Sequence, residues 1–137
     1  MLDWKDIYSV NVKEIDRQHK KLFEIGSSVF ELVSLNDEYD HYDEIMTILN
    51  ELKDYTVYHF DYEEKLLKKC GYENLDTHKF EHGFFVKKLG KMERKDIDGD
   101  QKEALKDLMV VVADWITHHI MESDMKYKQF FNERNIY

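Results

Sequence analysis

The chain has 137 residues, a formal net charge of −9 at pH 7, and 42% apolar residues. This length suffices for one domain with a substantial core. The acidic balance argues against sequence-independent nucleic-acid binding, which needs a basic face that displaces counterions, and against binding to an anionic membrane surface. No apolar run approaches the length of about 18 residues that a transmembrane helix needs, and the first residues do not resemble a signal peptide. We therefore expect one domain over residues 1–137 that works in the cytoplasm, with no nucleic-acid or membrane partner.

Long helices are predicted throughout the chain, because it contains no proline and only five glycines. Apolar residues recur at spacings of three and four, which is typical of helices with one buried face. Gly71 is placed to cap the C-terminus of the second helix. Asp16 is placed either to cap the N-terminus of the first helix, the role we favour, or to support His19. The four predicted helices cover residues 16–35, 40–70, 74–95 and 101–121.

The segments at the two ends of the chain differ from these helices. The first twelve residues include Trp4, Tyr8 and Val10 without a helical period, and we expect an arm that packs its aromatic side chains over one end of a bundle. Tyr127 and Phe131 indicate a short closing helix after the fourth long one. Because the connections between successive long helices are short, the sequence predicts an all-α fold. This is an antiparallel up-down-up-down four-helix bundle with an N-terminal arm and a short C-terminal helix.

Five of the seven histidines fall on the apolar faces of the predicted helices. They are His19, His59, His78, His82 and His119. The other two, His41 and His118, lie off these faces. One histidine on an apolar face is usually a core residue with an ordinary hydrogen bond, but five in one core would each leave a ring nitrogen to satisfy. Metal binding satisfies them together, since neutral imidazole readily binds iron, copper or zinc.

Two carboxylates accompany these histidines. Glu63 lies on the same apolar face as the histidine one helical turn before it, whereas Glu64 points about 100° away. Asp124 follows His119 by five residues, about 140° round an ideal helix, so both can face one point only if the helix ends or bends near Ser123. With five histidines, the two carboxylates make seven ligands, too many for one tetrahedral zinc ion. Two six-coordinate ions bridged by the carboxylates suit this set better.

The balance of the ligands favours iron and reversible binding. Iron fits imidazole and carboxylate ligands without thiolate. Ferritin-like di-iron oxidases use four carboxylates and two histidines from paired Glu-x-x-His motifs, and the motif from Glu38 to His41 falls in a predicted turn. A site rich in nitrogen ligands carries less negative charge and stabilises high-valent iron less well. We therefore expect a binding protein and not an enzyme.

Four motifs carry the candidate ligands in order along the chain. They are Ile15-Asp16-Arg17-Gln18-His19, His59-Phe60-Asp61-Tyr62-Glu63-Glu64, His78-Lys79-Phe80-Glu81-His82 and Trp115-Ile116-Thr117-His118-His119-Ile120-Met121-Glu122-Ser123-Asp124-Met125-Lys126-Tyr127. Together they span nearly the whole chain. As a set they resemble the motifs of the hemerythrin family, most closely those of the single-domain bacterial hemerythrins.

The resemblance implies a cofactor of two iron ions. One ion would be bound by three histidines and the other by two, with two carboxylates and an oxo or hydroxo group bridging both. The implied ligands are His78, His82 and His119 for the first ion, His19 and His59 for the second, and Glu63 and Asp124 for the bridges.

The resemblance also implies that dioxygen is the partner, bound reversibly at the iron with two histidines inside a closed apolar pocket. The residues that match the family's pocket are Leu22, Phe60, Trp115 and Ile120, with Tyr127 near the bridging Asp124. The expected role is an oxygen carrier, store, scavenger or delivery protein. An oxygen- or redox-sensing domain remains an alternative, followed by a di-iron oxidase or an enzyme that handles nitric oxide or peroxide. Protein partners cannot be predicted from these residues.

Overall fold

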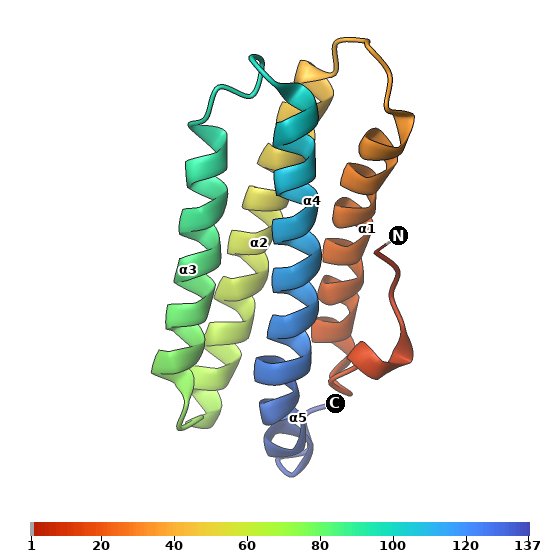
Figure 1. The fold of residues 1–137 in the computed structure, drawn as a ribbon. Coiled ribbons are helices and arrows are strands. Elements are labelled where there is room, and N and C mark those ends of the chain that lie inside the picture. Colours follow the sequence, from red (N-terminus) through yellow and green to blue (C-terminus); the bar gives the residue numbers. More distant parts are fainter. Residues whose placement is uncertain (1) are drawn as a thin grey trace.

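The computed structural model describes residues 2–137, and within that range it contains helices and no strand. The long helices run alternately in opposite directions and lie side by side (Figure 1). The α1–α2 and α3–α4 connections lie at one end of the bundle and the α2–α3 turn at the other. The predicted antiparallel four-helix bundle is therefore confirmed. Its helices are α1 (Lys13–Leu35), α2 (Tyr42–Cys70), α3 (Leu75–Glu93) and α4 (Gln101–His118).

Shorter helices complete both ends of the chain. The arm contains one turn of 3-10 helix, η1 (Asp6–Tyr8). After α4 the chain continues through a π-helix, η2 (His119–Asp124), into the short C-terminal helix α5 (Met125–Asn132). None of the helices among residues 2–137 has an apolar stretch long enough to cross a membrane.

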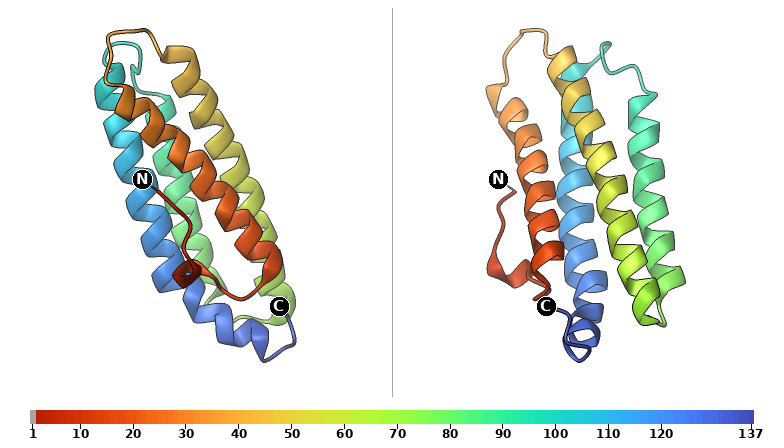
Figure 2. Two further views of the ribbon diagram at one scale, coloured as in Figure 1. Left: turned by 90° about the vertical axis from the view of Figure 1, so that its right-hand side faces the viewer. Right: turned by 180° about the vertical axis from the view of Figure 1, so that it is seen from behind.

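The N-terminal arm runs alongside α1 (Figure 2). Trp4 packs edge-on against Phe23 of α1, and Tyr8 lies 4.9 Å from the same ring between centroids. The aromatic side chains of the arm therefore pack on the side of α1, and the expectation that they cover one end of the bundle is wrong. The physical reason is Gly26, because a β-carbon there would lie 2.5 Å from the side chain of Leu2. The missing side chain leaves a notch that the arm fills.

One of the two predicted helix caps is observed and the other is not. Gly71 adopts a left-handed conformation with φ of 74° and closes α2, as predicted. Asp16 is not a cap, because α1 begins three residues earlier, at Lys13. Its carboxylate instead accepts hydrogen bonds from the Ser9 hydroxyl at 2.5 Å and the Val10 amide at 2.9 Å. Asp16 therefore fixes the arm to the first turn of α1.

Two apolar clusters form the core. The larger fills the bundle between the long helices. The smaller joins the arm, the end of α2 and α5, and consists of Val10, Val12, Ile15, Leu67, Tyr127 and Phe131. Among residues 2–137, ten polar residues are buried along with this apolar core, and they include all seven candidate ligands. Buried polar groups cost free energy unless they find partners, so these ten residues need a specific explanation.

His41 lies at the end of the bundle that carries the α1–α2 connection. Its contacts with two carboxylates should make the stability of the protein depend on pH. Its ring lies 2.9 Å from Glu44 and 2.7 Å from Asp37, and these carboxylates raise its pKa above 6.5. The resulting stabilisation is complete below about pH 6.5 and is lost as the pH rises through the folded-state pKa. We expect His41→Gln to lower the urea midpoint at mildly acidic pH and to match wild type at strongly alkaline pH. A difference that does not change with pH would contradict this role.

Candidate metal centre

The candidate ligands meet at the end of the bundle that carries the α2–α3 turn and α5 (Figure 1). His19 lies in the second turn of α1 and His78 in the first turn of α3. His59 and Glu63 lie in the second half of α2, and His119 follows directly after α4. In an antiparallel bundle the beginnings of α1 and α3 lie beside the ends of α2 and α4. The antiparallel topology therefore assembles the centre from segments far apart in the sequence.

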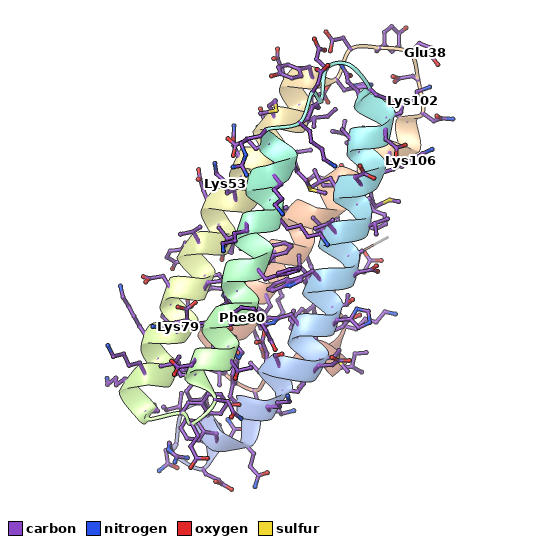
Figure 3. All side chains as sticks on the ribbon, turned by 60° about the vertical axis from the view of Figure 1, so that its left-hand side comes forward. Glu38, Lys53, Lys79, Phe80, Lys102 and Lys106 are labelled. Atoms are coloured by element: carbon purple, nitrogen blue, oxygen red, sulfur yellow. The ribbon has the colours of Figure 1, made fainter. Side chains whose placement is uncertain are left out.

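All seven side chains point inward. Glu63 and Asp124 are fully buried, and the five histidines are between 1% and 6% exposed. Phe80, two residues from both histidines of α3, is 75% exposed and is labelled on that helix in Figure 3. His118 is likewise exposed beside the buried His119. The candidate ligands therefore lie on the buried faces of their helices, as predicted.

The π-helix η2 brings the last two candidate ligands together. His119 and Asp124 are five residues apart, which is the hydrogen-bond spacing of a π-helix. The chain stays helical through η2 into α5, so the helix does not end near Ser123, but α5 points in a different direction from α4, in agreement with the expected bend (Figure 2). The wider turn of η2 places His119 Nε2 3.1 Å from Asp124 Oδ1. Because the π-helix begins at His119, α4 is also shorter than the predicted helix over residues 101–121.

The two oxygens of Glu63 face different histidines. Oε1 lies 2.5 Å from His78 Nε2 and 3.3 Å from His82 Nε2. Oε2 lies 3.2 Å from His59 Nε2 and 3.7 Å from His19 Nε2. We call His78, His82 and His119 the three-histidine group, and His19 and His59 the two-histidine group. Glu63 thus presents one oxygen to each group.

Asp124 divides its oxygens in the same way. Oδ1 lies 3.1 Å from the Nε2 atoms of His78 and His119. Oδ2 lies 3.1 Å from His19 Nε2. Both carboxylates therefore lie between the two histidine groups, with one oxygen directed to each. This is the arrangement that two carboxylates need to bridge a pair of ions.

The distances within the groups fit metal ions better than direct hydrogen bonds. Ligands at right angles, each about 2.1 Å from an ion, lie about 3 Å apart. His82 Nε2 and His119 Nε2 are 3.0 Å apart. His19 Nε2 and both oxygens of Asp124 are buried and find no hydrogen-bond partner within the described chain, despite their closeness. Ligand atoms aimed at a common point produce this geometry, so the residues present fit a pair of ions.

Both carboxylates are held in the ionised form. Burial would raise the pKa of Glu63, but the surrounding imidazoles hold it well below its usual value. Burial and the nearby Glu63 would raise the pKa of Asp124, which His119 and His19 hold well below its usual range. Burial lowers the pKa of His78, yet Asp124 and Glu63 raise it to about 10. Without a metal ion, a proton on histidine supplies the positive charge that these carboxylates require.

A second set of polar residues contacts the far nitrogens of three histidines. Glu64 Oε2 lies 2.8 Å from His82 Nδ1, and Gln18 Oε1 lies 2.7 Å from His59 Nδ1. A third residue, Glu81, lies 3.1 Å from Nδ1 of the histidine that follows α4. The sequence did not reveal these residues, because only side chains on the helix faces directed to the centre were considered as site residues. Each of them is adjacent in sequence to a candidate ligand, and this adjacency could have identified them.

The four predicted pocket residues line one small cavity beside the ligands. Leu22, Phe60 and Ile120 are buried and Trp115 is partly buried. The volume of the cavity is about 10 Å³, close to the minimum that one water molecule needs. Residues of both histidine groups and Asp124 share this lining. Its complete lining is His19, Leu22, His59, Phe60, Trp115, Ile116, His119, Ile120 and Asp124.

Tyr127 also lies at the centre, near Asp124 as expected, and its hydrogen bond goes to Glu63. Its hydroxyl donates a hydrogen bond to Glu63 Oε2 at 2.9 Å. The ring is fully buried in the smaller apolar cluster. Tyr127 therefore orients Glu63 from the side of α5.

Comparison with known proteins identifies the family. Residues 10–131 match the hemerythrin HHE cation binding domain. The chain belongs to the hemerythrin family. It is 42% identical over 127 residues to a bacteriohemerythrin of Clostridium acetobutylicum, covering 93% of this chain and 98% of that protein. It is 31% identical to a bacteriohemerythrin of Methylococcus capsulatus, covering 88% of each chain. A hemerythrin-like protein of Naegleria gruberi is 30% identical, over 92% of this chain and 90% of its own.

Removing metal from this hemerythrin should lower its thermal stability, because the buried carboxylates lose their cations. At a free-ion concentration about 1,000 times Kd, one ion adds about 4 kcal/mol to the free energy of unfolding. For a domain of this size, that corresponds to a change in Tm on the order of 10 °C. Calorimetry before and after chelation measures the change, with His118→Ala as a control that should behave like wild type. Equal midpoints with and without metal would contradict a bound ion.

Proposed function

We propose that the chain binds dioxygen reversibly at a non-haem di-iron centre and serves as an oxygen carrier, store, scavenger or delivery protein. The observation that carries this proposal is the division of the Glu63 and Asp124 oxygens between the two histidine groups. In our proposal both carboxylates bridge the ions, together with a solvent-derived oxo or hydroxo group. The three-histidine group would hold one ion and the two-histidine group the other.

The difference between the two groups indicates where dioxygen binds. With both carboxylates shared equally, the two-histidine group would offer its ion one protein ligand fewer than the three-histidine group. The cavity lined by Leu22, Phe60 and Ile120 adjoins both histidines of that group. We therefore propose that dioxygen enters this cavity. When bound, a pair of ferrous ions would supply the two electrons with which dioxygen binds and would recover them on its release.

The surrounding residues support reversible binding. The cavity is lined by apolar side chains and candidate ligands, which exclude bulk water and its protons. Asp124 is the only acidic residue in the described lining, and it would be engaged by both ions. An oxidase or reductase has to deliver protons to reduced oxygen, and this lining offers no further acid for that task. The same argument disfavours the peroxide- and nitric-oxide-handling alternatives.

Oxygen titration tests the proposal directly. The reduced, anaerobic protein should be nearly colourless and turn pink in air, through charge transfer to the iron. Removing oxygen should reverse the change over repeated cycles, as followed by visible absorption. Irreversible oxidation with immediate release of peroxide would contradict reversible binding and favour an oxidase.

The bridging role of Glu63 is tested by its removal. Glu63→Ala takes one oxygen from each ion, so iron content should fall well below two per chain. Elemental analysis against protein concentration measures the loss. His118→Ala is the matched control, because this exposed imidazole lies next to a candidate ligand, and it should retain the wild-type iron content. Full iron content in Glu63→Ala would rule out the proposed bridge.

A further inference from the structure

The two groups of histidines differ in the residues behind their rings. We propose that Glu64 and Glu81 make the three-histidine group the tighter of two unequal metal positions, so that it loads first. The proposal rests on the proposed function, because it concerns the metal ions of that same site. Glu64 and Glu81 are positioning residues, since they act through the histidines and do not reach the ions.

All five rings direct Nε2 towards the centre, as the contacts with Glu63 and Asp124 show. A neutral imidazole that binds metal through Nε2 carries its hydrogen on Nδ1. This Nδ1–H group donates a hydrogen bond to whatever lies behind the ring. The identity of that acceptor therefore influences the basicity of Nε2.

In the three-histidine group, carboxylates lie behind two of the rings. His82 Nδ1 donates to Glu64 Oε2 at 2.8 Å. His119 Nδ1 faces Glu81 Oε2 at 3.1 Å. The Ser123 hydroxyl donates to the same oxygen of Glu81 at 2.5 Å and fixes the carboxylate in place. Two ligands of this group are therefore backed by negative charge.

In the two-histidine group, no described residue places a carboxylate within hydrogen-bond distance behind either ring. His59 Nδ1 donates to the neutral amide oxygen Oε1 of Gln18 at 2.7 Å. Gln18 Nε2 in turn donates to Glu14 at 3.0 Å, which orients the amide. His19 Nδ1 is buried and has no hydrogen-bond partner among residues 2–137.

This difference should change metal affinity. A carboxylate that accepts the Nδ1 hydrogen bond increases electron density at Nε2 and makes it a stronger ligand, and its charge also attracts the cation. Removing such a residue typically lowers metal affinity about 10- to 100-fold. The Glu64 side chain is 23% exposed and that of Glu81 is 35% exposed. Solvent screens Glu81 more, so Glu64 should have the larger effect.

A cobalt titration of the full-length, metal-free protein tests the proposal. We expect Co²⁺ to bind in two steps, measured by visible absorption and by competition with a chelator. Glu64→Gln keeps the size and an acceptor oxygen but removes the charge. It should weaken the first step about 10- to 100-fold and leave the second within a few-fold. Glu122→Gln is the matched control, because this exposed carboxylate lies near His119 without an ion pair to it, and it should change neither step.

A second variant should change the affinity of the second cobalt-binding step. The double variant Glu14→Gln/Gln18→Glu exchanges the amide and the carboxylate between two residues that already share a hydrogen bond. It keeps the net charge and places negative charge behind His59. We expect the affinity of the second step to increase about tenfold or more, so that the affinities of the two steps become more similar. Urea unfolding of the metal-free variants separates changes in affinity from loss of the fold.

The outcomes are distinguishable. If wild type takes up no cobalt, zinc or iron, the proposed function fails and this inference with it. If wild type binds two ions but Glu64→Gln behaves like Glu122→Gln, only this inference is overturned. A tighter second step in the exchange variant, with a weaker first step in Glu64→Gln, supports it.

Discussion

Two buried carboxylates set the constraint on which the rest of this structure depends. Glu63 and Asp124 have no exposed surface, and burying ionised groups without compensation costs several kcal/mol each. Five imidazoles surround them, and the oxygen atoms face two separate groups of nitrogens. Both the metal chemistry and the stability of this end of the bundle follow from how that negative charge is balanced.

The two ends of the bundle differ in what they bury. The end with the α1–α2 and α3–α4 connections contains ordinary apolar packing, with hydrophobic residues such as Leu49, Leu89 and Leu105 in the core. The other end holds the polar centre and is covered by α5 and by the last residues of the arm, Val10 and Val12. Asp16 fixes the arm and Tyr127 connects α5 to Glu63. The closing segments therefore stabilise the centre as well as exclude solvent from it.

Aromatic rings restrict the movement of two candidate ligands. Phe60 stacks on His82 with ring centroids 3.7 Å apart, and Trp115 stacks on His119 at 4.3 Å. The same two aromatic residues line the small cavity. A shift of either ring would alter both a ligand and the space beside it. This coupling links the packing of the apolar core to the geometry of the metal centre.

The sequence alone determined much of this result. Helical periodicity, the absence of proline and the short connections predicted the bundle, and the spacing of His78 and His82 showed that both face inward. These features are local, because one helical turn relates the residues concerned. The family resemblance added the pocket residues, including Leu22.

The tertiary structure decided the features that depend on contacts between helices. The π-helix between His119 and Asp124 could not be predicted from an ideal 100° rotation, because its wider turn departs from that rotation where Asp124 contacts His19 of α1 and His78 of α3. Glu64 points away from the centre on its own helix, yet it meets His82 of the neighbouring helix. The sequence specifies the direction of a side chain within its helix. What that side chain contacts depends on how the helices pack together.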